Sequence, residues 1–171
     1  LLADVEGIMR AVLTVMPQAP SLDEDAFPQI THADVLRAVG LDHTAGSQLP
    51  AMARHYLAAT FPAFVWVTGF PERTRPFFVR SENGECIDAQ LWYRGVIYLA
   101  AGGERETSVD EMQRRIMAEG KDPERYEFFL KYLRSSLPRS VGMGFGLERL
   151  LGVLTSTAAA GFSSFPTPIG R

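Results

Sequence analysis

The sequence predicts an α+β fold in which an antiparallel β-sheet is flanked by helices. Short runs of β-branched and aromatic residues, bounded by Gly and Pro, gather between residues 64 and 101. Apolar residues recur with helical spacing on both sides of this region. The last helical pattern directly follows an alternation of Gly with bulky residues at 142–146. Short turns between neighbouring strands favour antiparallel pairing, which gives the predicted class.

Length and composition indicate a single domain over residues 1–171. A hydrophobic content of 46% is enough for one core, and a net charge of −3 gives no basic footprint for nucleic acid. Cys86 is the only cysteine, which excludes an intramolecular disulfide, and the three histidines show no metal-ligand spacing. The sequence contains no apolar run of about 18 residues and no leader pattern, so we expect a cytoplasmic protein without a membrane segment.

Three helices are expected before the first strand. The first carries apolar residues at helical spacing over 5–13. Thr31 caps a second helix that Gly40 closes, and a third covers 52–57. Residues 21–28, between the first two helices, are acidic and are interpreted as a solvated connector.

Four strands are expected in the central region. Residues 64–68 and 76–80 match buried strands, the second with Pro at its first position. Two more strands, 86–93 and 96–101, follow a turn at 82–84 and are joined by a second turn that contains Gly. Together the four strands are predicted to form an antiparallel meander.

Two further helices precede the glycine-rich strand. Ser108 begins a capping box, and Gly120 closes the helix that follows. Asp122 caps the next helix, where Phe128 and Tyr132 broaden the apolar stripe. These two aromatic residues are interpreted as part of a core, which is the commoner role of such residues.

The segment 142–149 joins a strand to a helix next to a bare surface. In an extended strand, alternating Gly residues leave one face without side chains, so a flat ligand can lie against the backbone. Leu147, Leu150 and Leu154 continue as the buried stripe of a helix, which places Arg149 on its other side. The alternative is a Gly-containing turn followed by a solvated arginine.

The pattern G-x-G-x-G-x-E-R before an apolar helix resembles motif 3 of class II aminoacyl-tRNA synthetases. The resemblance implies that Gly142, Gly144 and Gly146 floor the adenine pocket for ATP, next to Glu148. It also implies that Arg149 is the catalytic residue that contacts the nucleotide. The guanidinium group is planar and permanently charged, which suits stacking on a base and binding to phosphate oxygens.

Other segments resemble the aspartyl/asparaginyl branch of this family. Residues 64–80 are similar to its strand-turn-strand, and 101–105, with the sequence A-G-G-E-R, to its S-G-G-Q-R segment. The resemblance implies that Arg105, together with Gly102 and Gly103, binds the side chain of aspartate or asparagine. It also implies tRNA as a partner, for which the composition provides no basic footprint.

Several positions depart from the family pattern. Tyr98 and Ala101 stand where the branch has a glutamate and a serine. Asp88, which resembles the partner aspartate of the Mg²⁺ site, would therefore be left nearly alone as a metal ligand. Thr167 replaces the arginine of the family's closing F-P-R. We expect weak ATP binding with little enhancement by Mg²⁺.

Motifs 1 and 2 of the family have no counterpart in the sequence, because Leu1 corresponds to a point just after motif 2. The resemblance therefore implies a partial catalytic domain of an ATP-dependent, adenylate-forming ligase. Upstream residues, another chain or self-association would complete it. The competing hypothesis is a catalytically inactive synthetase-like protein that binds a nucleotide, an amino acid or a partner. A third is a structural fragment without a ligand.

Overall fold

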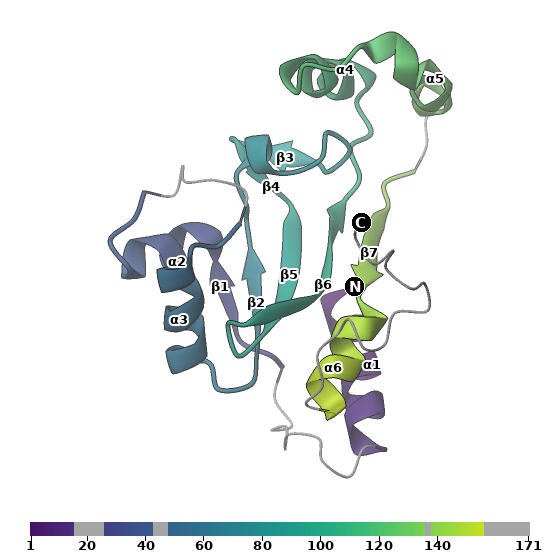
Figure 1. Cartoon of the computed structure of the whole chain (residues 1–171). Helices are drawn as coiled ribbons and strands as arrows, with labels where there is room; N and C mark the ends of the chain where they lie inside the picture. The colour runs from purple at the N-terminus through teal and green to yellow at the C-terminus, as the bar shows by residue number, and fades with distance from the viewer. Residues whose placement is uncertain (16–25, 43–47, 136–137, 156–171) are drawn as a thin grey trace, which may run out of the picture.

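The computed structural model describes residues 1–15, 26–42, 48–135 and 138–155. Its centre is a sheet with the strand order β1–β2–β5–β6–β7 (Figure 1). Neighbouring strands from β2 to β7 pair antiparallel, and β1 pairs parallel with β2. The predicted α+β class with a mainly antiparallel sheet is therefore confirmed. The strands of this sheet are β1 (Gln29–Thr31), β2 (Phe64–Thr68), β5 (Asp88–Tyr93), β6 (Ile97–Glu104) and β7 (Val141–Phe145).

Two helices begin at the caps that the sequence predicts, whereas Asp122 caps a 3₁₀ turn (Pro123–Tyr126) that precedes its predicted helix. The Thr31 hydroxyl accepts a hydrogen bond from the Asp34 amide at 3.0 Å, and the Ser108 hydroxyl accepts one from the Glu111 amide at 3.3 Å. No helix in the described ranges is long and apolar enough to span a bilayer. The helices are α1 (Leu2–Thr14), α2 (His32–Ala38), α3 (Ala51–Thr60), α4 (Val109–Ala118), α5 (Glu127–Arg134) and α6 (Leu147–Thr155).

Each face of the sheet has its own hydrophobic core. On one face, α1 and α6 cover alternate residues of β2 and β5, including Trp66 and Leu91. Trp66 also donates its indole N–H to the buried Glu6 carboxylate at 2.8 Å. On the other face, α2 and α3 pack on the intervening residues, including Val65 and Trp92. The period-two alternation along each strand thus divides the side chains between two cores.

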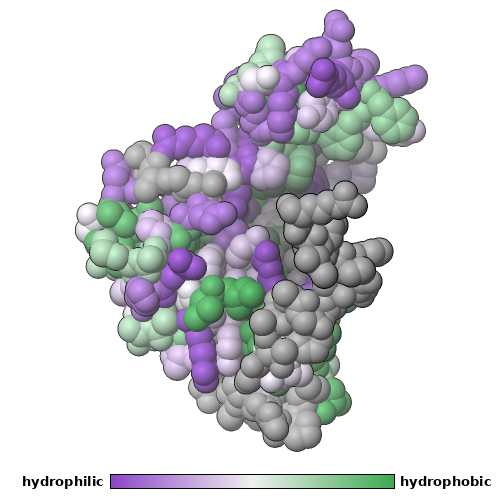
Figure 2. Space-filling view, viewed as in Figure 1, coloured by the Kyte–Doolittle hydropathy of each residue, from purple (hydrophilic) through white to green (hydrophobic). Residues whose placement is uncertain are grey.

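Helices α4 and α5 form a lobe beyond one end of the sheet (Figure 1). Its core includes Met112 and Leu130, both almost completely buried. Phe128 and Tyr132 lie on the outer side of α5, with 76% and 51% of their surfaces exposed, so their interpretation as core residues is wrong. Phe128 and Tyr132 are four positions apart and therefore lie on the same face of α5. Leu130 lies on the other face, which packs into the core of the lobe. Figure 2 shows hydrophilic side chains over most of this lobe and hydrophobic ones along its right-hand side.

Two strand predictions differ from the structure. Residues 76–80 form a turn, closed by a hydrogen bond from the Val79 amide to the Pro76 carbonyl at 3.0 Å, instead of a strand. A short hairpin, β3 (Ser81–Glu82) with β4 (Glu85–Cys86), follows this turn. The sequence analysis also missed β1. The predicted acidic connector falls mostly on residues 21–25, which lie outside the described ranges.

Candidate functional site

Strand register places a strip without side chains on the sheet. Met143 and Phe145 pack into the core beneath α1 and α6, so Gly142 and Gly144 face the opposite side. On that side, Gly144 lies opposite Ala101, and Gly142 lies opposite Gly103. We call this side of β5, β6 and β7 the site face. It offers backbone and small side chains over two neighbouring strands.

The three glycines of the motif have different surroundings. A Cβ atom at Gly144 would have no neighbour closer than the Ala101 carbonyl oxygen at 3.8 Å, so this position is open. A Cβ atom at Gly142 would lie 2.6 Å from the Arg105 guanidinium, so this glycine makes room for the arginine. Gly146 lies after the end of β7 and accepts the first hydrogen bond of α6, from the Leu150 amide at 2.9 Å. The predicted strand therefore ends one residue earlier.

Arg149 lies against the sheet from the first turn of α6. Its guanidinium carbon is 4.2 Å from the centroid of the Tyr98 ring, and Nη1 donates to the Tyr98 carbonyl oxygen at 3.1 Å. A guanidinium group stacked on one aromatic ring keeps its other face available for a second planar group. Glu148, also in the first turn, is exposed. The arrangement suits Arg149 for contact with a nucleotide.

Arg105 lies at the far end of the same strip, just after β6. Its guanidinium carbon is 4.8 Å from the centroid of the Phe78 ring, and its amide donates to the Ser140 carbonyl oxygen at 2.8 Å. With Gly102 and Gly142, Arg105 lines a cavity of about 300 Å³. A half-buried arginine in a small cavity is suited to bind a carboxylate or an amide oxygen.

The two arginines line two adjoining cavities. Arg149 contributes to a second cavity of about 560 Å³. Arg75, Gln90 and Tyr98 line both cavities and form their common wall. Because the cavities adjoin, ligands in the two would lie next to each other.

Asp88 is already engaged by protein groups. Its carboxylate accepts hydrogen bonds from Arg75 Nε at 2.7 Å and from the Phe70 amide at 3.0 Å. Burial raises the pKa of Asp88, while the charge of Arg75 acts in the opposite direction. Within the described ranges, no group of three or more His, Cys, Asp or Glu side chains could hold a metal ion. Since Ala101 carries no oxygen on its side chain and Tyr98 only a phenol, the residues present do not fit a Mg²⁺ site.

Sequence reasoning missed two residues of the site. Arg75 follows a 3₁₀ turn (Glu72–Thr74), and its guanidinium stacks on the Phe70 ring at 3.6 Å. Gln90 is buried and accepts a hydrogen bond from the Trp92 indole at 3.1 Å. The alternation along β5 could have placed Gln90 on the same face as Asp88, because residues two positions apart in a strand point to the same side of the sheet.

Comparisons with known proteins identify the family of this chain. A family model described as tRNA synthetases class II (D, K and N) matches residues 2–166. An aspartate–tRNA(Asp/Asn) ligase of Methanopyrus kandleri is 33% identical over 77% of this chain, and an asparagine–tRNA ligase of Thermococcus gammatolerans is 30% identical over 87%. The chain spans 31% and 35%, respectively, of these two relatives.

Solved structures show the same likeness. The asparaginyl-tRNA synthetase of Pyrococcus horikoshii superimposes with a TM-score of 0.73 at 27% identity, over 86% of this chain and 37% of that one. A structure of the same enzyme with asparaginyl-adenylate gives a TM-score of 0.72 at 26% identity, over 85% of this chain and 36% of that one. With the family model matching nearly the whole sequence, this chain belongs to the class II tRNA synthetases of the D, K and N group.

Proposed function

We propose that this chain supplies the adenine and amino-acid subsites of an adenylate-forming ligase of the aspartyl/asparaginyl-tRNA synthetase type. The observation that carries the proposal is the open main chain at Gly144, with Arg105 packed over Gly142 and Arg149 on the same face of the sheet. Adenine would lie over Gly144 between the strip and Arg149. Aspartate or asparagine would place its side chain against Arg105, in the adjoining cavity.

The adjoining cavities suit a reaction between two bound substrates. In adenylate formation, an oxygen of the amino-acid α-carboxylate attacks the α-phosphorus of ATP. The bond from that phosphorus to the bridging oxygen breaks, and pyrophosphate leaves with the bond's electron pair. Holding both reactants in fixed orientation lowers the entropic part of the barrier. Arg149 would bind the nucleotide and Arg105 would orient the amino acid, while tRNA would be the acceptor in a later step.

One observation favours a second candidate, a binding module without catalysis. Asp88 is paired with Arg75, and Tyr98 and Ala101 offer no carboxylate, so this part of the site has little means to position a phosphate-bound cation. The described chain would then bind a nucleotide or an amino acid without joining them. Both candidates use the same cavities and differ only in turnover.

We expect ATP to bind this chain weakly, with an affinity that Mg²⁺ changes by less than about threefold. The physical reason is that the Tyr98 phenol and the Ala101 methyl group offer no carboxylate oxygen to a hard cation. Calorimetric titration of ATP with and without Mg²⁺ measures this directly. Tight and strongly Mg²⁺-dependent binding would contradict the interpretation of Tyr98 and Ala101.

Pyrophosphate exchange separates the two candidate functions. Exchange that requires aspartate or asparagine would show a ligase, whereas ATP binding without exchange would favour the binding module. If ATP produces neither heat of binding nor a thermal shift, both candidates fail. The double variant Tyr98→Glu/Ala101→Ser is the matched gain-of-function control, because it adds two oxygen ligands to the cavity that Asp88 also lines and should make ATP binding Mg²⁺-dependent.

A further inference from the structure

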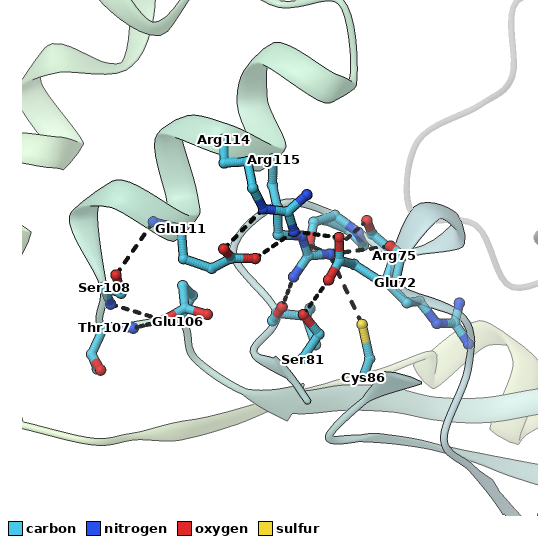
Figure 3. Close-up of polar contacts among 12 residues, drawn as sticks. Glu72, Arg75, Ser81, Cys86, Glu106, Thr107, Ser108, Glu111, Arg114 and Arg115 are labelled. Atoms are coloured by element: carbon cyan, nitrogen blue, oxygen red, sulfur yellow. Dashed lines mark hydrogen bonds and ion pairs between the residues drawn. The ribbon is translucent and has the colours of Figure 1, made fainter. Parts of the chain in front are cut away.

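Arg115 of α4 lies outside the cavities but contacts the loop that carries Arg75. Only 3% of its surface is exposed. Its guanidinium donates to the main-chain carbonyl oxygens of Glu72, Arg75 and Pro76 at 3.2, 3.3 and 3.2 Å, and also to that of Val79 (Figure 3). A buried guanidinium group requires partners for its N–H groups, and here main-chain oxygens provide them. The Arg115 side chain thus binds four main-chain carbonyl groups of residues 72–79. We call this segment the 72–79 loop.

The 72–79 loop needs such a partner because it contains little regular structure. Apart from the 3₁₀ turn and an isolated antiparallel bridge between Val79 and Arg105, the loop forms no helix or strand. Buried carbonyl groups without partners are costly, so a single multidentate donor stabilises this irregular path. The conformation of the loop therefore depends on a helix in the α4–α5 lobe.

Arg75 connects the loop to the site. Its main-chain carbonyl binds Arg115, whereas its side chain binds Asp88 and lines both cavities. Only 4% of the Asp88 side chain is exposed, compared with 13% for Arg75. Asp88 also lines the Arg105 cavity. If Arg75 moved away, a buried carboxylate would lose its counter-charge close to the group proposed to bind the amino acid.

We infer that Arg115 is a positioning residue for this site: it holds the 72–79 loop so that Arg75 neutralises Asp88 beside the amino-acid cavity. The inference rests on the proposed function for its effect on ligands. Without Arg115, the loop would relax and the uncompensated Asp88 charge would repel an anionic ligand more than a neutral one. Aspartate and asparagine are similar in size and differ in side-chain charge, so their relative affinity reports this effect.

The neighbouring arginine provides a matched control. Arg114 also lies on α4, but it is exposed and binds the carboxylates of Glu72 and Glu111 (Figure 3). It makes no hydrogen bond to the four loop carbonyls that Arg115 contacts. Arg114→Met therefore removes the same charge from the same helix, together with one side-chain contact to Glu72, but keeps the hydrogen bonds from Arg115 to the four loop carbonyls.

The labelling rate of the Cys86 thiol measures whether the loop has moved, and it requires no ligand. Its thiol is buried 3.9 Å from Arg115 Nη2, and burial raises the pKa of the thiol to about 11. Removing the Arg115 charge alone would raise this pKa further and slow the reaction of the thiol. Faster labelling of Cys86 by a disulfide reagent in Arg115→Met would therefore show that the thiol has become accessible.

The experiment measures Cys86 labelling and the affinities for L-aspartate and L-asparagine in the native chain, Arg115→Met, Arg115→Lys and Arg114→Met. Circular dichroism establishes that each variant is folded. We expect Arg115→Met to label at least tenfold faster and to weaken aspartate binding at least fivefold more than asparagine binding. Arg115→Lys should lie between it and the native chain, and Arg114→Met should behave like the native chain.

Three results would overturn the inference. If Cys86 of Arg115→Met were labelled at the same rate as Cys86 of the native chain, Arg115 would not hold the loop. Equal weakening for the two amino acids, or the same change in Arg114→Met, would show that Arg115 does not act through the Asp88 charge. If the native chain binds neither amino acid, the proposed function fails and the effect on ligands fails with it, while the labelling rates still decide whether Arg115 holds the loop.

Discussion

Replacing Arg149 with Met is expected to lower the affinity for ATP on the order of 100-fold while leaving the fold intact. The guanidinium lies against the Tyr98 ring at 4.2 Å and is half-buried. It is the group proposed to cover adenine and to bind phosphate oxygens, and Met retains its length and apolar stem without its charge. Calorimetric titration of ATP into the native chain and the variant measures the effect.

Arg10 provides the control for this substitution. Its guanidinium also lies over an aromatic ring, that of Phe27 at 5.2 Å, but Arg10 is on α1 and lines neither of the two cavities. Arg10→Met should bind ATP as the native chain does. An Arg149→Met variant that keeps native affinity, or an equal loss in Arg10→Met, would refute the assignment of Arg149 to the nucleotide.

Replacing Gly102 with Ala is expected to lower the free energy of unfolding by about 3 kcal/mol or more. A Cβ atom at this position would lie 2.5 Å from the Met143 Cα atom and 2.8 Å from the Gly142 carbonyl carbon. These are main-chain atoms of β7, so the clash can be relieved only by moving the strand. Chemical denaturation followed by circular dichroism measures the loss.

The neighbouring position provides the comparison for this substitution. A Cβ atom at Gly144 would have its nearest neighbour at 3.8 Å, an ordinary van der Waals distance, so Gly144→Ala should change the stability by less than about 1 kcal/mol. If both variants unfold at the same denaturant concentration, β7 does not approach Gly102 as closely as the structure shows.

Sequence patterns predicted those elements whose signals are local. The caps at Thr31 and Ser108 were predicted because a hydroxyl binds an amide only three residues away. The turn at residues 82–84 was also predicted, since Asn83 and Gly84 adopt the positive φ angles that these residue types tolerate. The glycine alternation predicted the open position at Gly144, because the period of a strand is fixed. It did not predict that Arg105 covers Gly142 or that Gly146 lies beyond the end of β7.

Non-local interactions account for the errors. Residues 76–80 have the composition of a strand, but several carbonyls of the 72–79 loop turn toward Arg115, more than 30 residues along the chain. β1 is three residues long, and its strand character comes from parallel pairing with β2. Arg75 was overlooked for a related reason, because its importance comes from Asp88 and from the cavities that meet at its side chain.

The open strip beside Arg149 is the central claim, and Gly144→Val tests it most directly. A Cβ atom at this position would have no neighbour closer than 3.8 Å, and β-branched residues favour strands, so the variant should retain its stability. The two methyl groups would occupy the space proposed for adenine. Calorimetric titration of ATP should therefore give a measurable affinity for the native chain and no detectable binding for folded Gly144→Val. Equal ATP affinities for the two proteins would contradict the claim.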